Sequence, residues 1–405
     1  MQFKDLIGHG EMAQHLTDMV QHNRLSHAMI FLGKEGNGGL AMALAFAQYV
    51  VCERVHPHAS QSIQKDGMFE EVDAEFTENE VVDKTDSCGK CNACLKAQQF
   101  VHPDIHYSYP VIPRKAGDKP RSVDYVQEWR SFIKAQPYGN VYDWLQSIGA
   151  ENKQGNITAY ECSDINHKLS LKSFESDFKI LIMWMPEYLG NEGNKLLKLI
   201  EEPPANTLFI FVAENEALIL QTILSRCQLI KIPPFIPAEI EKGLVENQNI
   251  NPVLAAQISL ISEGNYREAM QLVQHAEEDW QALLREWLNS MLKTGPQAQV
   301  KWVEEVSKLG REKQKQFLRY FNHILHQSIR LRINSGDGAV ASREADFMQR
   351  LNKIAALEQQ KAIINLLDEA VWHIERNANG KMLFHALTIR IYHVIRDGAL
   401  VEAWS

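Results

Sequence analysis

The sequence predicts an α/β fold with a parallel sheet, followed by a small helical domain and an all-helical domain. Two apolar, β-rich runs, Lys179–Trp184 and Thr207–Ala213, are short enough to be buried parallel strands. Between them, Glu192–Ile200 has apolar residues at helical spacing, and the prolines at 203 and 204 end that helix. From residue 277 onward, amphipathic helical segments continue to the end of the sequence.

Composition limits the classes of protein to which this chain can belong. With 405 residues, 45% hydrophobic and 23% charged, the chain is long enough for two or three domains. No apolar run approaches the ~18 residues of a membrane span, and the start lacks a signal-peptide pattern. We therefore expect a cytoplasmic protein. The net charge of −9 comes largely from nine acidic residues between Asp66 and Asp86, and nothing in the composition suggests a tight autonomous nucleic-acid binder.

A glycine-rich turn joins the first predicted strand, Met29–Leu32, to a helix, Leu40–Val51. Strand, glycine-rich turn and helix form the layout of a P-loop, which holds phosphates with backbone N–H groups. A working P-loop ends in Gly-Lys-Ser/Thr, with the lysine for the phosphates and the hydroxyl for magnesium. Here both groups are missing, so we expect a degenerate P-loop without bound ATP; its glycines are Gly33, Gly36, Gly38 and Gly39.

Four cysteines predict a metal site. Cys52 ends the P-loop helix, and Cys88, Cys91 and Cys94 form a CxxCxxC knuckle. Four sulfur ligands suit tetrahedral Zn²⁺, although a knuckle by itself also fits part of an iron–sulfur ligand set. Residues 53–87 would loop out between the ligands as an acidic insertion, and their composition predicts partial disorder.

A second insertion follows the strand predicted at Ile105–Tyr109. Residues 110–155 contain two short predicted helices, Val123–Lys134 and Tyr142–Ile148, which carry five aromatic residues. Aromatic residues at helical spacing are typical of a core, so we interpret this segment as a helical decoration packed on the sheet. Another helix, Glu161–Leu171, leads back to the strand at residue 179.

Arg226 is the candidate catalytic residue. It lies in Ser225-Arg226-Cys227, directly before a short strand, Gln228–Ile232. That position places the arginine outside the sheet, where its charge can reach another molecule. A surface arginine that pairs with a neighbouring carboxylate is the more common situation in proteins, so the tripeptide alone is a weak signal.

Several short motifs occur in a characteristic order: IGH, RLSHA, FLGKEGNGG, the cysteine knuckle, HPD, LLKLIEEPP, SRC and GNYREA. This series resembles the AAA-type clamp-loader ATPases of DNA replication, over nearly the whole chain. The resemblance implies an AAA-type P-loop core at residues 1–233 with a zinc module at 52–94, a helical lid at 234–276 and a helical collar at 277–405. A proline-rich break at 233–237 agrees with the first boundary.

The same resemblance assigns roles to individual residues. It implies that Arg226, with Ser225, projects into the ATP site of a neighbouring subunit, and that the cysteines hold structural zinc. Arg267 matches the sensor-2 arginine of the lid and would be a remnant here. Where family ATPases carry acidic residues for magnesium, this chain has Met183-Trp184-Met185-Pro186, and thioether and indole groups do not bind that ion.

Within this family, a lost P-loop combined with a retained Ser-Arg-Cys resembles a stator, and the resemblance implies an accessory subunit of the DNA polymerase III holoenzyme that does not hydrolyse ATP. Its expected partners are the γ/τ and δ subunits of the clamp loader, and, through the assembled complex, the sliding clamp and primer-template DNA. One alternative is a γ/τ-like motor subunit that hydrolyses ATP itself. Another is a zinc-dependent nucleic-acid-binding module, which would need a basic face beside the knuckle, where only Lys90 and Lys96 lie.

Overall fold

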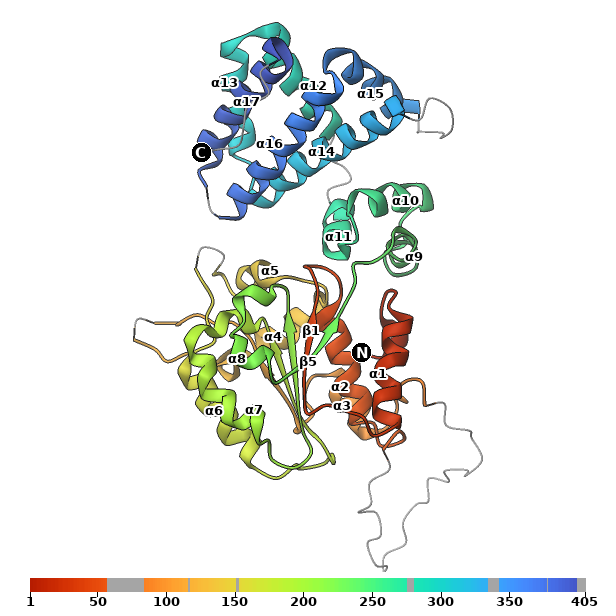
Figure 1. Ribbon diagram of the computed structural model, residues 1–405, viewed down its shortest axis with the longest axis vertical. Helices are drawn as coiled ribbons and strands as arrows, with labels where there is room; N and C mark the ends of the chain where they lie inside the picture. The colour runs from red at the N-terminus through yellow and green to blue at the C-terminus, as the bar shows by residue number, and fades with distance from the viewer. Residues whose placement is uncertain are drawn as a thin grey trace, which may run out of the picture. The chain divides into compact units, whose positions relative to one another are not determined.

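The computed structural model describes residues 1–56, 84–115, 117–150, 153–274, 280–333, 342–376 and 378–398. The chain divides into two compact units, Met1–Gln271 and Leu272–Ser405 (Figure 1). A separate core and lid, divided at residue 233, remain a prediction. Most of the acidic insertion at 53–87 lies outside the described residues. Among the described helices, none has both the length and the apolar character needed to cross a membrane.

The first unit is built on a five-stranded sheet in the order β2-β3-β4-β1-β5, with every neighbouring pair parallel. This sheet and the helical second unit confirm the predicted fold class. Strand β1 lies between β4 and β5, so the glycine-rich turn leaves the interior of the sheet rather than its edge. The strands are β1 (Ala28–Leu32), β2 (Ile105–Ser108), β3 (Lys179–Trp184), β4 (Thr207–Ala213) and β5 (Gln228–Lys231).

Helices cover both faces of the sheet because alternate strand residues point to opposite sides. Met29 and Phe31 of β1 belong to one apolar core, whereas Ala28 and Ile30 belong to the other. In Figure 1, α2 and α6 accordingly lie on opposite sides of the sheet. The first core contains residues of α1 (Gly10–Gln21), α2 (Gly39–Val50), α3 (Asn92–Gln98), α4 (Val126–Ala135) and α5 (Val141–Ser147). The second contains residues of α6 (Ala159–Ser170), α7 (Leu197–Glu201) and α8 (Gln221–Leu224).

One predicted helix is wrong in its start. Instead of a regular helix at Glu192–Ile200, the chain forms an irregular 3₁₀ segment, η4 (Pro186–Leu196), before the short helix α7. Gly193 lies within the predicted helix, and Gly190, two residues before its start, breaks the helical geometry of η4 with a φ of 51°. Glycine disfavours helix interiors because it loses the most backbone freedom on folding. Helical spacing of apolar residues therefore did not suffice to form an α-helix there.

The insertion at 110–155 packs on the sheet through its aromatic residues. Its short 3₁₀ turn, η3 (Ser122–Tyr125), leads into α4, and α5 follows. The ring of Trp129 stacks on Tyr109 at a centroid distance of 4.0 Å. The indole N–H of Trp144 donates to the carbonyl of Pro110 over 2.7 Å. This packing leaves the turn between α4 and α5 close to the glycine-rich loop.

Three helices follow β5: α9 (Pro237–Gln248), α10 (Pro252–Ile261) and α11 (Tyr266–Gln274), and the boundary between the two units falls within α11. The second unit is helical throughout its described residues. Its core contains Trp287 and Trp302, whose rings stack at 4.6 Å, and Trp287 donates to Thr388 over 3.0 Å. Its elements are α12 (Trp280–Asn289), the π-helical η6 (Ser290–Thr294), α13 (Pro296–Ser307), α14 (Arg311–Ile333), α15 (Ser342–Ile354), α16 (Leu357–Glu375) and α17 (Gly380–Asp397).

Candidate functional site

Arg226 lies near the N-terminal ends of the strands, whereas the glycine-rich loop follows the C-terminal end of β1. Gln228, two residues after Arg226, pairs with Met29 near the start of β1, whereas Gly33 follows directly after the end of β1. Because all strands are parallel, the length of β1 separates the two sites by roughly 13 Å, at 3.3 Å per residue. Arg226 therefore lies away from the glycine-rich loop of its own chain.

The Arg226 side chain is partly exposed, at 35% of its surface. Its guanidinium forms an ion pair with Glu201, the last residue of α7. Its Nη1 group also donates to the carbonyl oxygen of Thr222 over 2.8 Å and contacts the hydroxyl of Ser225 at 3.2 Å. Ser225 thus orients the arginine, and the side chain remains on the surface of the unit.

The side chain of Asn37 forms hydrogen bonds that close the glycine-rich loop. Asn37 is 5% exposed, and its Oδ1 accepts the N–H of Gly39 over 3.1 Å. Its Nδ2 donates to the carbonyl of Ile232 over 2.9 Å. In a P-loop, backbone N–H groups at the start of the helix bind phosphate. Here one of these donors, the N–H of Gly39, is already bonded to Asn37.

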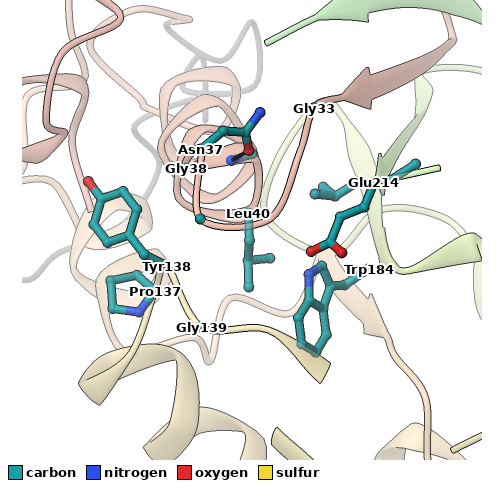
Figure 2. A pocket seen from close by; sticks show the side chains of 13 residues that line it. Gly33, Asn37, Gly38, Leu40, Pro137, Tyr138, Gly139, Trp184 and Glu214 are labelled. Carbon is teal, nitrogen blue, oxygen red and sulfur yellow. Dashed lines mark hydrogen bonds between the residues drawn. The ribbon is translucent and has the colours of Figure 1, made fainter. Parts of the chain in front are cut away.

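The cavity at the loop is about 20 Å³, which is room for a water molecule. Figure 2 shows Tyr138 facing the loop on one side, with Trp184 and Glu214 on the other. Trp184 is the last residue of β3. It belongs to the segment that, by resemblance, carries magnesium-binding acidic residues in the family ATPases. Burial, together with the neighbouring carboxylates of Glu35 and Glu187, raises the pKa of Glu214 to about 8.

Arg267, the sensor-2-like residue, is 5% exposed and lies at the start of α11. Its guanidinium pairs with Asp143 of α5 and, over 2.8 Å, with Glu35 of the glycine-rich loop. The arginine therefore makes structural ion pairs with residues of two other segments. These partners were not predicted.

The four cysteines come together as one cluster. Their sulfur atoms all lie within 4.8 Å of one another, and the Sγ atoms of Cys88 and Cys94 are 3.9 Å apart. Tetrahedral zinc with Zn–S bonds of about 2.3 Å would separate its sulfur ligands by about 3.8 Å. Cys52 and Cys94 are fully buried. The cluster therefore has the spacing needed to bind a metal ion.

Backbone N–H groups surround these sulfurs. Cys52 accepts the N–H of Cys88 over 3.3 Å, and Cys91 accepts the N–H of Cys94 over 3.4 Å. Such donors stabilise thiolate ligands and fix their orientation. Hydrogen bonds with Cys91 and Cys94 lower the pKa of Cys52, and the contact with Cys52 raises the pKa of Cys94. A divalent cation would allow all four thiols to ionise.

The sequence analysis singled out Arg226, the glycines and the cysteines, but it missed their partners. Glu201, which the structure pairs with Arg226, is not among those residues. The sequence analysis assigned no role to Asn37, Tyr138 or Asp143. Asn37 was visible within the glycine-rich loop, where an amide can bond a neighbouring backbone. No local pattern identifies the other two, because their contacts span more than 120 residues along the chain.

Comparison with known proteins identifies the family. The sequence model of the family described as "DNA polymerase III, delta subunit" matches residues 8–72 and 58–236, more than half of the chain. The delta′ subunit of DNA polymerase III from Bacillus subtilis is 24% identical over 263 residues, which cover 65% of this chain and 58% of that protein.

Two further relatives point in the same direction. The delta′ subunit from Haemophilus influenzae is 28% identical over 42% of this chain and 41% of its own length. The DNA polymerase III gamma subunit from Buchnera aphidicola is 24% identical over 67% of this chain and 56% of its own length. The chain thus spans about half the length of the curated relatives that it matches. It belongs to the family of DNA polymerase III delta subunits, as a relative of the delta′ subunits of bacterial clamp loaders.

Proposed function

We propose that this chain is the delta′ subunit, or stator, of a bacterial DNA polymerase III clamp loader. It would not hydrolyse ATP, and it would supply Arg226 to ATP bound on a neighbouring γ/τ subunit. It would contact the δ subunit on its other side. The assembled complex would then open the sliding clamp and place it on primed DNA. The cytoplasmic location expected from the sequence belongs to the same proposal.

The observation that carries this proposal is the placement of Arg226. The side chain is partly exposed at the N-terminal end of the strands, and the glycine-rich loop lies at their C-terminal end. Arg226 therefore cannot serve a nucleotide at its own loop. An arginine brought to a transferring phosphoryl group neutralises the charge that develops there. The neighbouring subunit would supply the lysine, the magnesium ion and the attacking water.

The rival motor function has less support. Some relatives are named gamma or tau subunits, but here Gly39 and Leu40 stand where a motor needs lysine and a hydroxyl. Asn37 also accepts the N–H of Gly39 within the loop, and the cavity beside it is about 20 Å³, which counts against a bound triphosphate. We therefore retain the stator proposal over the motor.

We further propose Zn²⁺ as the ion of the four-cysteine cluster. Cys52, Cys88, Cys91 and Cys94 supply four sulfurs and no open position, which is typical of a structural zinc site. Bound metal would link the end of α2 to the start of α3, because Cys52 follows α2 and Cys91 caps α3. This role is structural and takes no part in phosphoryl transfer.

Assembly tests the proposed function. The purified chain, mixed with γ/τ and δ subunits of the same organism, should elute with them as one complex in size-exclusion chromatography. Failure to bind the γ/τ subunit would contradict a stator function. If the chain hydrolyses ATP in the absence of the γ/τ subunit, as well as binding that subunit, the result would support the motor alternative instead.

A further inference from the structure

We propose that the insertion at residues 110–155 is a built-in substitute for nucleotide. Through Tyr138 and Asp143 it holds helix α11 of the lid against the glycine-rich loop, so that the lid keeps one position whether or not ATP is present. The proposal concerns the chain by itself and does not depend on the role of Arg226.

Arg267 is the centre of this arrangement. Two of its nitrogens face the carboxylate of Asp143, with Nη2 and Oδ1 2.6 Å apart, and Nη1 faces Glu35 at 2.8 Å. A bidentate arginine–carboxylate pair fixes both distance and orientation. The side chains of Arg267 and Asp143 are only 5% and 11% exposed, so solvent screens the pair little. Three separate segments, the lid, the insertion and the loop, meet at one guanidinium.

Asp143 is held ready for this contact by its own helix. It is the third residue of α5, where a capping box joins it to Asn140. Its Oδ2 accepts the N–H of Asn140 over 3.1 Å, and its own N–H donates to Asn140 Oδ1 over 2.9 Å. A capping box restricts the rotamers of both side chains. The carboxylate is therefore positioned by the insertion rather than by the arginine.

Tyr138 makes the second link. Its ring lies 4.9 Å from that of Tyr266 in the lid and 6.1 Å from that of Phe235. Its hydroxyl accepts the N–H of Ile7 over 3.1 Å. A Cβ atom added at Gly38 would lie 3.1 Å from the Tyr138 ring, and the φ of +84° at Gly38 also favours glycine. The aromatic residues thus cover the loop where a nucleotide would enter.

The lid backbone also contacts the loop directly. The N–H of Tyr266 donates to the carbonyl of Gly36 over 3.1 Å. A Cβ at Gly36 would lie only 1.8 Å from Oδ1 of Asn265, so this approach requires a glycine. In the ATPases that this chain resembles, the lid arginine lies over the γ-phosphate. Here the carboxylates of Asp143 and Glu35 pair with Arg267 instead, so groups of the protein itself take the place of the ligand.

Hydrogen–deuterium exchange of the full-length chain, followed by mass spectrometry, tests the proposal. Asp143→Asn keeps the shape of the side chain and removes its charge. We expect amides of α11 and of residues 36–39 to exchange at least about tenfold faster, because breaking a buried ion pair leaves Arg267 without its main counter-charge. Tyr138→Ala should accelerate the same two segments. Mg·ATP added to the unmodified chain should change neither segment.

Glu128→Gln is the matched control, because Glu128 lies in the same insertion and forms an exposed ion pair with Arg114. It should leave both segments unchanged. If Asp143→Asn does not yield folded protein, Glu35→Gln removes the other arm of the ion pair and should still accelerate exchange in α11. Unchanged exchange in the folded variants, a uniform acceleration of the whole first unit, or protection of α11 by Mg·ATP would overturn the proposal.

Discussion

Arg226 and Glu201 form an ion pair that joins two of the sequence segments that carry the resemblance to clamp loaders. Glu201 closes helix α7 in the LLKLIEEPP segment, and Arg226 follows α8 in the Ser-Arg-Cys tripeptide. Both side chains are partly exposed, at 45% and 35%. An exposed pair contributes little to folding stability. In the proposed function, Arg226 would have to exchange Glu201 for phosphate oxygens before it could act on ATP of a neighbouring subunit.

This relationship predicts the effect of Glu201→Gln. The glutamine retains a hydrogen-bond acceptor for Arg226 but removes the competing negative charge. We expect ATP turnover of the assembled clamp loader to stay equal or rise, and the free energy of unfolding to change by at most about 1 kcal/mol. Steady-state turnover and denaturant unfolding measure the two quantities. A tenfold fall in turnover with intact assembly would show that Glu201 supports the reaction instead.

The cysteine cluster predicts about one zinc ion per chain in metal analysis of the purified protein. Cys94→Ser should remove the metal and lower the unfolding temperature by several degrees, because Cys94 is fully buried at the cluster. Cys162→Ser is the control, since Cys162 is also buried but lies outside the cluster. It should leave the metal content unchanged. Bound iron, or full zinc content in the Cys94 variant, would refute the assignment.

Glu214 predicts a pH dependence of stability. Burial raises its pKa from 4.5 to about 8 in the folded chain, so the folded state binds the proton more tightly than the unfolded state. The contribution of Glu214 to the free energy of unfolding is complete below pH 4.5. It is lost as the pH rises toward 8, by up to about 1.4 kcal/mol per pH unit. Glu214→Gln should flatten this decline between pH 6 and pH 8, measured by urea unfolding. An equal decline in the variant would exclude Glu214 as its source.

The closed loop predicts that the isolated chain binds no nucleotide. Asn37 occupies the N–H of Gly39, and Trp184 and Glu214 line the remaining space. Calorimetric titration with Mg·ATP to high micromolar concentration should therefore give no heat of binding. A γ/τ subunit titrated under the same conditions provides the positive control. Saturable binding to this chain would contradict the closed loop.

Periodicity and motif order predicted much of the fold. The buried runs at β3 and β4 have the predicted bounds, because continuous apolar stretches of this length fit a sheet covered on both faces. The helix predicted at Glu192–Ile200 differed because Gly193 lies within it and a kink at Gly190 comes just before it, although its apolar spacing is regular.

The candidate site was predictable only where a residue type carries its own chemistry. Four cysteines at metal-ligand spacing predicted a cluster that the structure brings together. Arg267 pairs with Asp143, 124 residues away along the chain, and this partner was not predicted. A contact of this kind depends on how the insertion folds back over the loop. No pattern within one segment reveals it.

The central claim is that Arg226 acts on ATP held by another subunit. Its most direct test is the turnover of clamp loader assembled with the Arg226→Ala variant, normalised to the amount of complex. Arg114→Ala, which removes another partly exposed arginine, serves as the control. We predict normal assembly and a fall of about 10³-fold in the rate of ATP hydrolysis at the site that Arg226 serves. The rapid burst of hydrolysis by the complex should therefore be smaller by the amount that this site contributes. An undiminished burst from fully assembled Arg226→Ala complex would contradict the account.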